Sequence, residues 1–113
     1  MKSVLCPSDV EKINKKFGGS LRNRGSLNFA IATGRDRTPR QKLALLWRAI
    51  LVDHPFSDGN KRTVEILTRK YAKEQRYRIN TSRLVREIID VSKESVTDLA
   101  RIERRIKYAC TGD

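Results

Sequence analysis

Residues 54–62, with the sequence HPFSDGNKR, bring several chemically capable side chains into one short stretch. His54 is the only histidine of the chain, and an imidazole suits the role of general base near neutral pH. Asp58 provides carboxylate oxygens, the hard ligands that a magnesium ion prefers. Lys61 and Arg62 add cations that could bind phosphate groups. Together these residue types indicate a transferase that uses a nucleotide.

The elements on either side of this stretch position it. Residues 43–52 are apolar with a single exception, and they follow Thr38 and Pro39, which are typical of a helix start. This pattern predicts a buried central helix that ends just before His54. A second helical pattern comes after the stretch, so residues 59–62 should open the next helix. Because a helix N-terminus has free backbone N–H groups and the positive end of the dipole, it is a ready anion site.

The other residues of the stretch have simpler expected roles. Gly59 would let the backbone approach a phosphate, and the amides near Asn60 and Lys61, with the Asn60 side chain, would form an anion-binding site. Phe56 should be a hydrophobic anchor that buries the loop. For each residue alone a structural role is the simpler interpretation, since Asp-Gly, for example, is common in turns. The whole set at this spacing favours an enzyme.

At these residues the sequence resembles a known family. The pattern His-x-Phe-x-Asp-Gly-Asn-Lys-Arg, followed by Thr63, resembles the signature of the Fic/Doc family, and most closely that of its small Doc-type toxins. Residues 19–27, GSLRNRGSL, are similar to the glycine-rich segment that precedes the catalytic core in Doc-like proteins. The resemblance covers nearly the whole chain and implies one Fic/Doc-like domain over residues 1–113. The implied fold is all-α, a helical bundle with a short flap loop or hairpin.

The resemblance also implies the chemistry of the site. His54 would be the general base that takes a proton from a hydroxyl of a protein substrate. Asp58 would hold Mg²⁺ between the phosphates of ATP or another nucleoside triphosphate. The phosphates would be bound by Gly59, Asn60, Lys61 and Arg62. The flap would hold the backbone of the protein substrate by strand addition, and would consist of Ser20, Leu21, Arg22, Asn23 and Arg24.

Lys61 is informative about the reaction. Many AMP-transferring Fic proteins have glycine at this position, whereas the lysine of Doc-type toxins is associated with phosphoryl transfer to a threonine of elongation factor Tu. The resemblance therefore predicts a Doc-like toxin that transfers a phosphoryl group from ATP to a protein hydroxyl. One alternative is transfer of AMP (AMPylation) by the same residues. A non-enzyme alternative is a basic helical domain that binds nucleic acid.

The chain is strongly basic, with 25 Lys and Arg residues against 13 Asp and Glu and a net charge of +12. Such a charge is compatible with nucleic acid, with an acidic protein partner or with a merely solvated surface. Aromatic residues make up only 6% and do not alternate with the basic ones, so a stacking platform for single-stranded nucleic acid is not favoured. The charge alone does not decide between these partners.

The absence of certain sequence patterns leads to expectations about the partner of the protein and about its location. It has no Ser/Thr-x-x-x-Glu-Gly/Asn pattern, which marks the inhibitory helix of some Fic proteins, so we expect a separate antitoxin with an acidic segment. No stretch resembles a membrane span or a signal peptide, so we expect no membrane association and a cytoplasmic location. Cys6 and Cys110 lack a CxxC pattern and a nearby histidine, which is typical of plain reduced thiols.

Apolar periodicity predicts the remaining elements. A first helix should begin at residues 7–9 and end before Gly18, a short helix should cover residues 27–31, and residues 33–37 should form a loop. The first of the three later helices should turn Val64, Leu67 and Tyr71 inward. The second should be capped by residues 80–82, Asn-Thr-Ser, and should turn inward Leu84, Val85, Ile88 and Ile89. The last, with Ser95 as its cap, should turn inward Val96, Leu99, Ile102 and Ile106. The last helix should expose Arg101, Arg104, Arg105 and Lys107.

Overall fold

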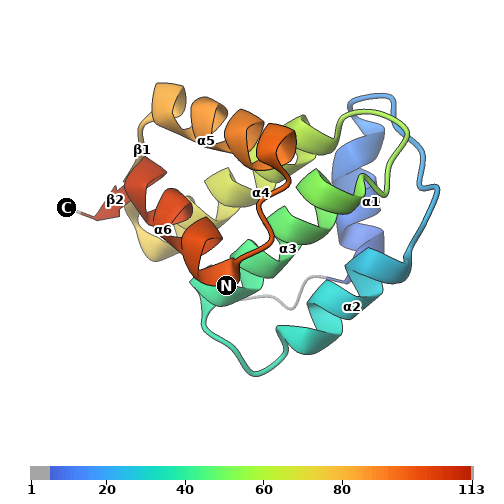
Figure 1. Ribbon diagram of the computed structural model, residues 1–113, viewed down its shortest axis with the longest axis horizontal. Helices are drawn as coiled ribbons and strands as arrows, with labels where there is room; N and C mark the ends of the chain where they lie inside the picture. The colour runs from blue at the N-terminus through green and yellow to red at the C-terminus, as the bar shows by residue number, and fades with distance from the viewer. Residues whose placement is uncertain (1–5, 113) are drawn as a thin grey trace.

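The computed structural model describes residues 6–112. This part of the chain forms six helices and two short strands (Figure 1): α1 Pro7–Lys15, α2 Gly25–Thr33, α3 Pro39–Asp53, α4 Asn60–Gln75, β1 Tyr77–Ile79, α5 Thr81–Glu94, α6 Leu99–Ala109 and β2 Cys110–Gly112. The expected all-α bundle is therefore confirmed. The helix expected at residues 27–31 is α2, and the loop expected after it begins at Gly34.

Helix α3 is the centre of the bundle, as Figure 1 shows, and it contacts α2, α4, α5 and α6. Its consecutive residues from Leu43 to Trp47 are all buried, because neighbouring helices cover it on several sides. Thr38 caps its N-terminus as expected, since the Thr38 side chain accepts a hydrogen bond from the Gln41 N–H. The one cation within the apolar run, Arg48, reaches out and donates to the Thr97 carbonyl at 3.4 Å.

Helix α4 packs on α3 through an apolar stripe and a buried polar contact. Val64, Leu67 and Tyr71 are buried, as the periodicity predicted. The Trp47 indole N–H donates to the Thr68 hydroxyl at 2.9 Å, and this hydroxyl donates to the Val64 carbonyl. Because both polar groups are buried and paired, this contact sets the register of α4 against α3 without an unsatisfied donor.

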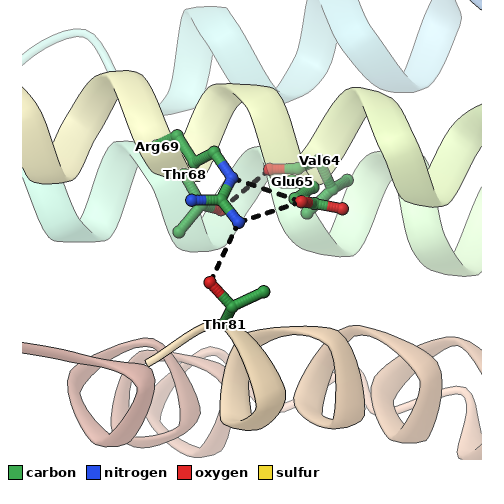
Figure 2. A network of polar contacts seen from close by, with 5 residues as sticks. All are labelled: Val64, Glu65, Thr68, Arg69 and Thr81. Atoms are coloured by element: carbon green, nitrogen blue, oxygen red, sulfur yellow. Dashed lines mark hydrogen bonds and ion pairs between the residues drawn. The ribbon is translucent and has the colours of Figure 1, made fainter. Parts of the chain in front are cut away.

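A polar network on the outside of α4 ties it to α5 (Figure 2). The Arg69 guanidinium donates through Nε and Nη2 to the Glu65 carboxylate at 3.2 and 3.1 Å, one turn earlier on α4. Its Nη2 also donates to the hydroxyl of Thr81, the first residue of α5, at 3.3 Å. The network therefore fixes where α5 begins relative to α4.

The structure contains one small sheet that the sequence did not predict. Strands β1 and β2 pair antiparallel, with Tyr77 opposite Gly112 and Ile79 opposite Cys110. The sheet lies at the left edge of Figure 1, where it joins the start of α5 to the end of α6. Each strand has only three residues, which is too short for an alternation of apolar and polar residues to be recognised.

Two of the predicted inward positions on α5 are wrong. Val85 is 39% exposed and Ile89 is 44% exposed, whereas Leu84 and Ile88 are buried as expected. The four residues form two stripes about 100° apart on the helix, and only the stripe of Leu84 and Ile88 points at the core. The pattern of apolar residues was wider than the buried face.

The start of the last helix also differs from the prediction. Ser95 does not cap α6; it ends α5 in the left-handed conformation, and the cap of α6 is Asp98, whose side chain accepts from the Ala100 N–H. Arg105 was expected in solvent but turns toward α5, where it donates to the Glu87 carboxylate at 2.9 Å. The buried stripe of α6 is as predicted at Ile102 and Ile106.

No helix within residues 6–112 is long and apolar enough to cross a membrane. Cys6 is exposed, and Cys110 is buried with its pKa raised to about 11, because burial disfavours the thiolate. Both are free cysteines, and no cluster of metal-ligating side chains surrounds either of them in the part of the chain that the structure describes.

Candidate active site

The stretch of residues 54–62 forms the loop between α3 and α4 and the first turn of α4. His54 ends α3 with a φ of 49°, and Gly59 precedes α4 with a φ of 74°. Both residues are therefore in the left-handed region, which is uncommon for residues other than glycine. These two left-handed residues change the direction of the chain, and the short loop between them leads into α4. His54 and Asp58 are both exposed at its surface.

Phe56 and Asn60 anchor the loop of residues 54–59, called the motif loop. Phe56 is 1% exposed and belongs to the core. The Asn60 carboxamide binds the Phe56 backbone twice, donating to its carbonyl at 3.0 Å and accepting from its N–H at 3.2 Å. The sequence placed this carboxamide among the phosphate-binding groups. In the structure its two polar atoms hold the loop, so Asn60 offers the groove its backbone N–H.

The predicted flap lies against the motif loop rather than forming a hairpin of its own. Leu21 and Phe56 form an isolated antiparallel bridge. The Ser57 N–H donates to the Ser20 carbonyl at 2.9 Å, and the Arg22 N–H donates to the Pro55 carbonyl at 2.8 Å. Since these bonds flank Leu21, the N–H and carbonyl of Leu21 point to the opposite edge of the flap.

The far end of the flap also makes contacts that stabilise the fold. Asn23 accepts a hydrogen bond from the Gly25 N–H through its side chain and so helps to start α2. The Arg24 guanidinium lies 2.8 Å from the Glu11 carboxylate of α1. Of the five residues predicted for the flap, Ser20, Leu21 and Arg22 run alongside the motif loop, and the Asn23 N–H also donates to the Pro55 carbonyl at 3.3 Å.

A groove of about 600 Å³ lies over the motif loop. It brings together His54 and Asp58 with all four residues predicted to bind phosphate, and Lys16 and Phe17 form its other wall; the lining residues are Lys16, Phe17, His54, Ser57, Asp58, Gly59, Asn60, Lys61 and Arg62. The Arg62 guanidinium carbon lies 5.6 Å from the centre of the Phe17 ring.

The N-terminus of α4 opens into this groove without a side-chain cap. The Thr63 N–H is the first one bonded within the helix, to the Gly59 carbonyl at 2.9 Å. The preceding N–H groups, of Asn60, Lys61 and Arg62, therefore have no helical acceptor. With the positive end of the helix dipole and three cationic side chains on its wall, the groove is suited to bind a phosphate chain.

The groove also fits a magnesium ion that arrives with phosphates. Asp58 is its one carboxylate, and no group of three or more His, Cys, Asp or Glu side chains in residues 6–112 could form a protein-only metal site. Mg²⁺ bound with a nucleotide needs only one or two carboxylates, because phosphate and water oxygens complete its octahedron. One Asp58 oxygen accepts from the Gly59 N–H at 2.8 Å, which orients the carboxylate.

Sequence reasoning missed the contribution of α1 and the turn after it. Lys16 and Phe17 line the groove, and Asn14, only 1% exposed, donates to the Asp58 carbonyl at 2.7 Å. A signal was present, because Asn14 lies four residues after Val10 and so interrupts the apolar stripe of α1. A polar residue within a buried stripe usually has a specific partner. Nothing in the pattern could say which partner.

A model of the Fic/DOC family matches residues 5–72, a range that contains the whole groove. Neither a search of curated proteins nor a search of solved structures found a match.

Proposed function

The chain belongs to the Fic/Doc family, generally nucleotide-transferring enzymes that act on proteins, and we propose that it is a Doc-like toxin that phosphorylates a protein hydroxyl. ATP is the proposed donor and Mg²⁺ the proposed metal. The whole chain would act as one Fic/Doc-like domain in the cytoplasm. The observation that carries this proposal is Lys61, an exposed cation in the first turn of α4, at the uncapped helix end.

Lys61 favours transfer of the terminal phosphate. An ammonium group is a compact point charge, so it stabilises the γ-phosphate, which bears the most negative charge of the triphosphate. The same side chain occupies space that an α-phosphate would need at the helix tip if AMP were transferred. Arg62, held over the Phe17 ring, can bind the equatorial oxygens on which charge develops.

The remaining roles follow from the groove. The oxygen of the substrate hydroxyl attacks the γ-phosphorus, the bond from that phosphorus to the bridging β,γ-oxygen breaks, and ADP leaves. His54 accepts the proton of the hydroxyl. Asp58 would hold Mg²⁺, which supplies charge neutralisation between the phosphates. The free edge of the flap at Leu21 is where the substrate backbone would pair.

Parallel reactions with ATP labelled at the α- or the γ-phosphate test the proposal. Label from the γ-phosphate alone is expected in the protein substrate, and label from the α-phosphate alone would show AMP transfer and overturn the assignment. Lys61→Gly should reduce γ-transfer, while Lys73→Gly, the same change in the last turn of α4, should not. Transfer of neither label, together with nucleic-acid binding, would favour the non-enzyme alternative.

We further propose that the toxin is restrained by a separate antitoxin with an acidic segment that complements the net charge of +12. The Ser/Thr-x-x-x-Glu-Gly/Asn pattern of an internal inhibitory helix does not occur in the sequence. Expression of the chain alone should therefore arrest growth, and His54→Ala should relieve the arrest. Harmless expression of a protein with confirmed transferase activity would contradict the need for an antitoxin. An elongation factor such as elongation factor Tu is the first protein substrate to test.

A further inference from the structure

Asn14 is a buried side chain of α1 that contacts the motif loop from outside the groove. It is 1% exposed. Its amide nitrogen donates to the Asp58 carbonyl at 2.7 Å and to the Thr63 hydroxyl at 3.1 Å. These two partners lie on either side of Gly59, one in the loop and one in α4. Asn14 therefore joins α1 to the point where the loop becomes a helix.

The chemistry of this contact requires a carboxamide. The Thr63 hydroxyl donates to the Gly59 carbonyl at 2.7 Å, so toward Asn14 its oxygen can only accept. The Asp58 carbonyl is also an acceptor. Both partners thus need an N–H, and an asparagine nitrogen has two to give. An aspartate of the same shape would place a carboxylate oxygen against the Asp58 carbonyl.

The other end of the Asn14 carboxamide makes no such contact within residues 6–112. Its Oδ1 is buried without a hydrogen-bond partner among the described residues. A Cβ on Gly19 would lie 2.2 Å from Oδ1 and 2.3 Å from the Asp58 carbonyl oxygen, so only glycine fits at this position. A buried polar atom without a partner is costly, and such groups are rare in folded proteins. A specific role at the opposite end of the side chain would explain its presence.

The Asp58–Gly59 peptide links Asn14 to the groove. Its carbonyl is held by Asn14, and its N–H donates to the Asp58 carboxylate at 2.8 Å. Because the carbonyl and N–H of a trans peptide point in opposite directions, fixing the carbonyl also fixes the direction of the N–H. A rotation of this peptide would therefore release the carboxylate from its hydrogen bond.

We propose that Asn14 is a positioning residue that sets the Asp58 carboxylate for a magnesium–nucleotide complex. This inference rests on the proposed function of the groove. It assigns a role in metal use to α1, a helix that contributes none of the residues of the motif. Groups that orient a metal ligand typically change metal affinity or activity by about 10- to 100-fold when they are removed.

The test compares Asn14→Leu with wild type in titrations with ATP, in the presence of Mg²⁺ and in the presence of a chelator. Binding of Mg²⁺·ATP should weaken by about 10- to 100-fold in the variant, while binding of metal-free ATP should change little. Thr68→Val is the matched control, because it removes another buried hydrogen bond, to Trp47, away from the groove. It should lower thermal stability and leave the effect of Mg²⁺ unchanged. Equal loss of binding with and without Mg²⁺ would overturn the proposal.

Amide exchange measured by NMR on the free protein separates this inference from the proposed reaction. The Gly59 N–H should exchange with solvent faster in Asn14→Leu than in wild type, and an unchanged rate would overturn the positioning role. If wild type were found to transfer AMP, the proposed reaction would fail and this result would still stand. If Asn14→Leu does not fold, the wild-type protein provides the test. Its Asn14 amide protons must be protected and must shift with Mg²⁺·ATP but not with metal-free ATP, and the absence of either effect would overturn the role.

Discussion

Helices α3 and α4 lie against each other, yet they begin in opposite ways. The N-terminus of α3 is closed by a capping box, in which Thr38 and Gln41 exchange hydrogen bonds between side chain and backbone, and Pro39 occupies the first turn. The N-terminus of α4 follows Gly59, which has no side chain with which to cap it. One helix end is completed by its own residues, and the other is left open.

The cations in the first turns of the two helices also differ, because within the described residues only that of α3 is paired with a carboxylate. In the first turn of α3, Arg40 lies 3.6 Å from the Glu103 carboxylate. Lys61 and Arg62 of α4 have no ion pair within residues 6–112, although cations at a helix N-terminus are repelled by the dipole. A missing cap and unpaired cations both disfavour the free protein. A bound phosphate chain would remove both penalties, which is why the open end indicates a binding site.

The largest expected effect is that of a substitution at His54, which should reduce the transfer rate without reducing ATP binding at the open N-terminus of α4. His54→Ala should lower transfer by roughly 100- to 10,000-fold, because the general base is lost. Binding of ATP should remain, since in the proposed arrangement the phosphates would contact α4 and not His54. His54→Asn is a second variant that tolerates the left-handed backbone at this position. Transfer at the wild-type rate in both variants would show that His54 is not the base.

A substitution at the cap of α4 should disturb both the fold and the binding site. Gly59→Ala places a Cβ 2.8 Å from the Phe17 Cβ at a residue with a φ of 74°, so it combines backbone strain with a clash. Gly18→Ala is the matched control, because Gly18 has a φ of 78° and open space around it. Gly18→Ala should cost about 1–2 kcal/mol of unfolding free energy, the cost of the left-handed backbone alone.

Gly59→Ala should lose about 1–3 kcal/mol more than this control, from overpacking. Its affinity for Mg²⁺·ATP should also fall, whereas that of Gly18→Ala should not. Chemical denaturation and nucleotide titration measure the two effects. Equal behaviour of the two variants would mean that the close approach of Gly59 to Phe17 has no role in the groove.

The smallest effect is expected at the closed end. Thr38→Ala removes the cap of α3 and should lower the unfolding free energy by about 1 kcal/mol, without a change in nucleotide affinity or transfer rate. Asn80→Ala, at the capped start of α5, provides a second example of the same cost. A change in nucleotide affinity in Thr38→Ala would contradict the distinction between a structural and a functional helix end.

The predictions that were correct depended on interactions between residues close together in the chain. The start of α3 was predicted correctly because Thr38 caps the residues that immediately follow it. The start of α5 was predicted within residues 80–82, and in the structure Asn80 is the cap. The errors have non-local causes. Which of two apolar stripes on α5 is buried depends on where α4 and α6 lie, so Val85 and Ile89 could not be assigned from spacing. Ser95 and Asp98 are both plausible caps, and only the path of the chain between α5 and α6 distinguishes them.

The candidate site also has a part that follows from neighbouring residues in the chain and a part that depends on the packing of distant elements. The contiguous part could be predicted from the sequence, because a short loop between two helices keeps His54, Asp58 and the first turn of α4 within one groove. Tertiary structure decided the rest. It brought Lys16 and Phe17 to the opposite wall and placed Asn14 against the Asp58 carbonyl. These contacts join residues far apart in the chain, and they depend on how α1 packs against α4, which no local pattern encodes.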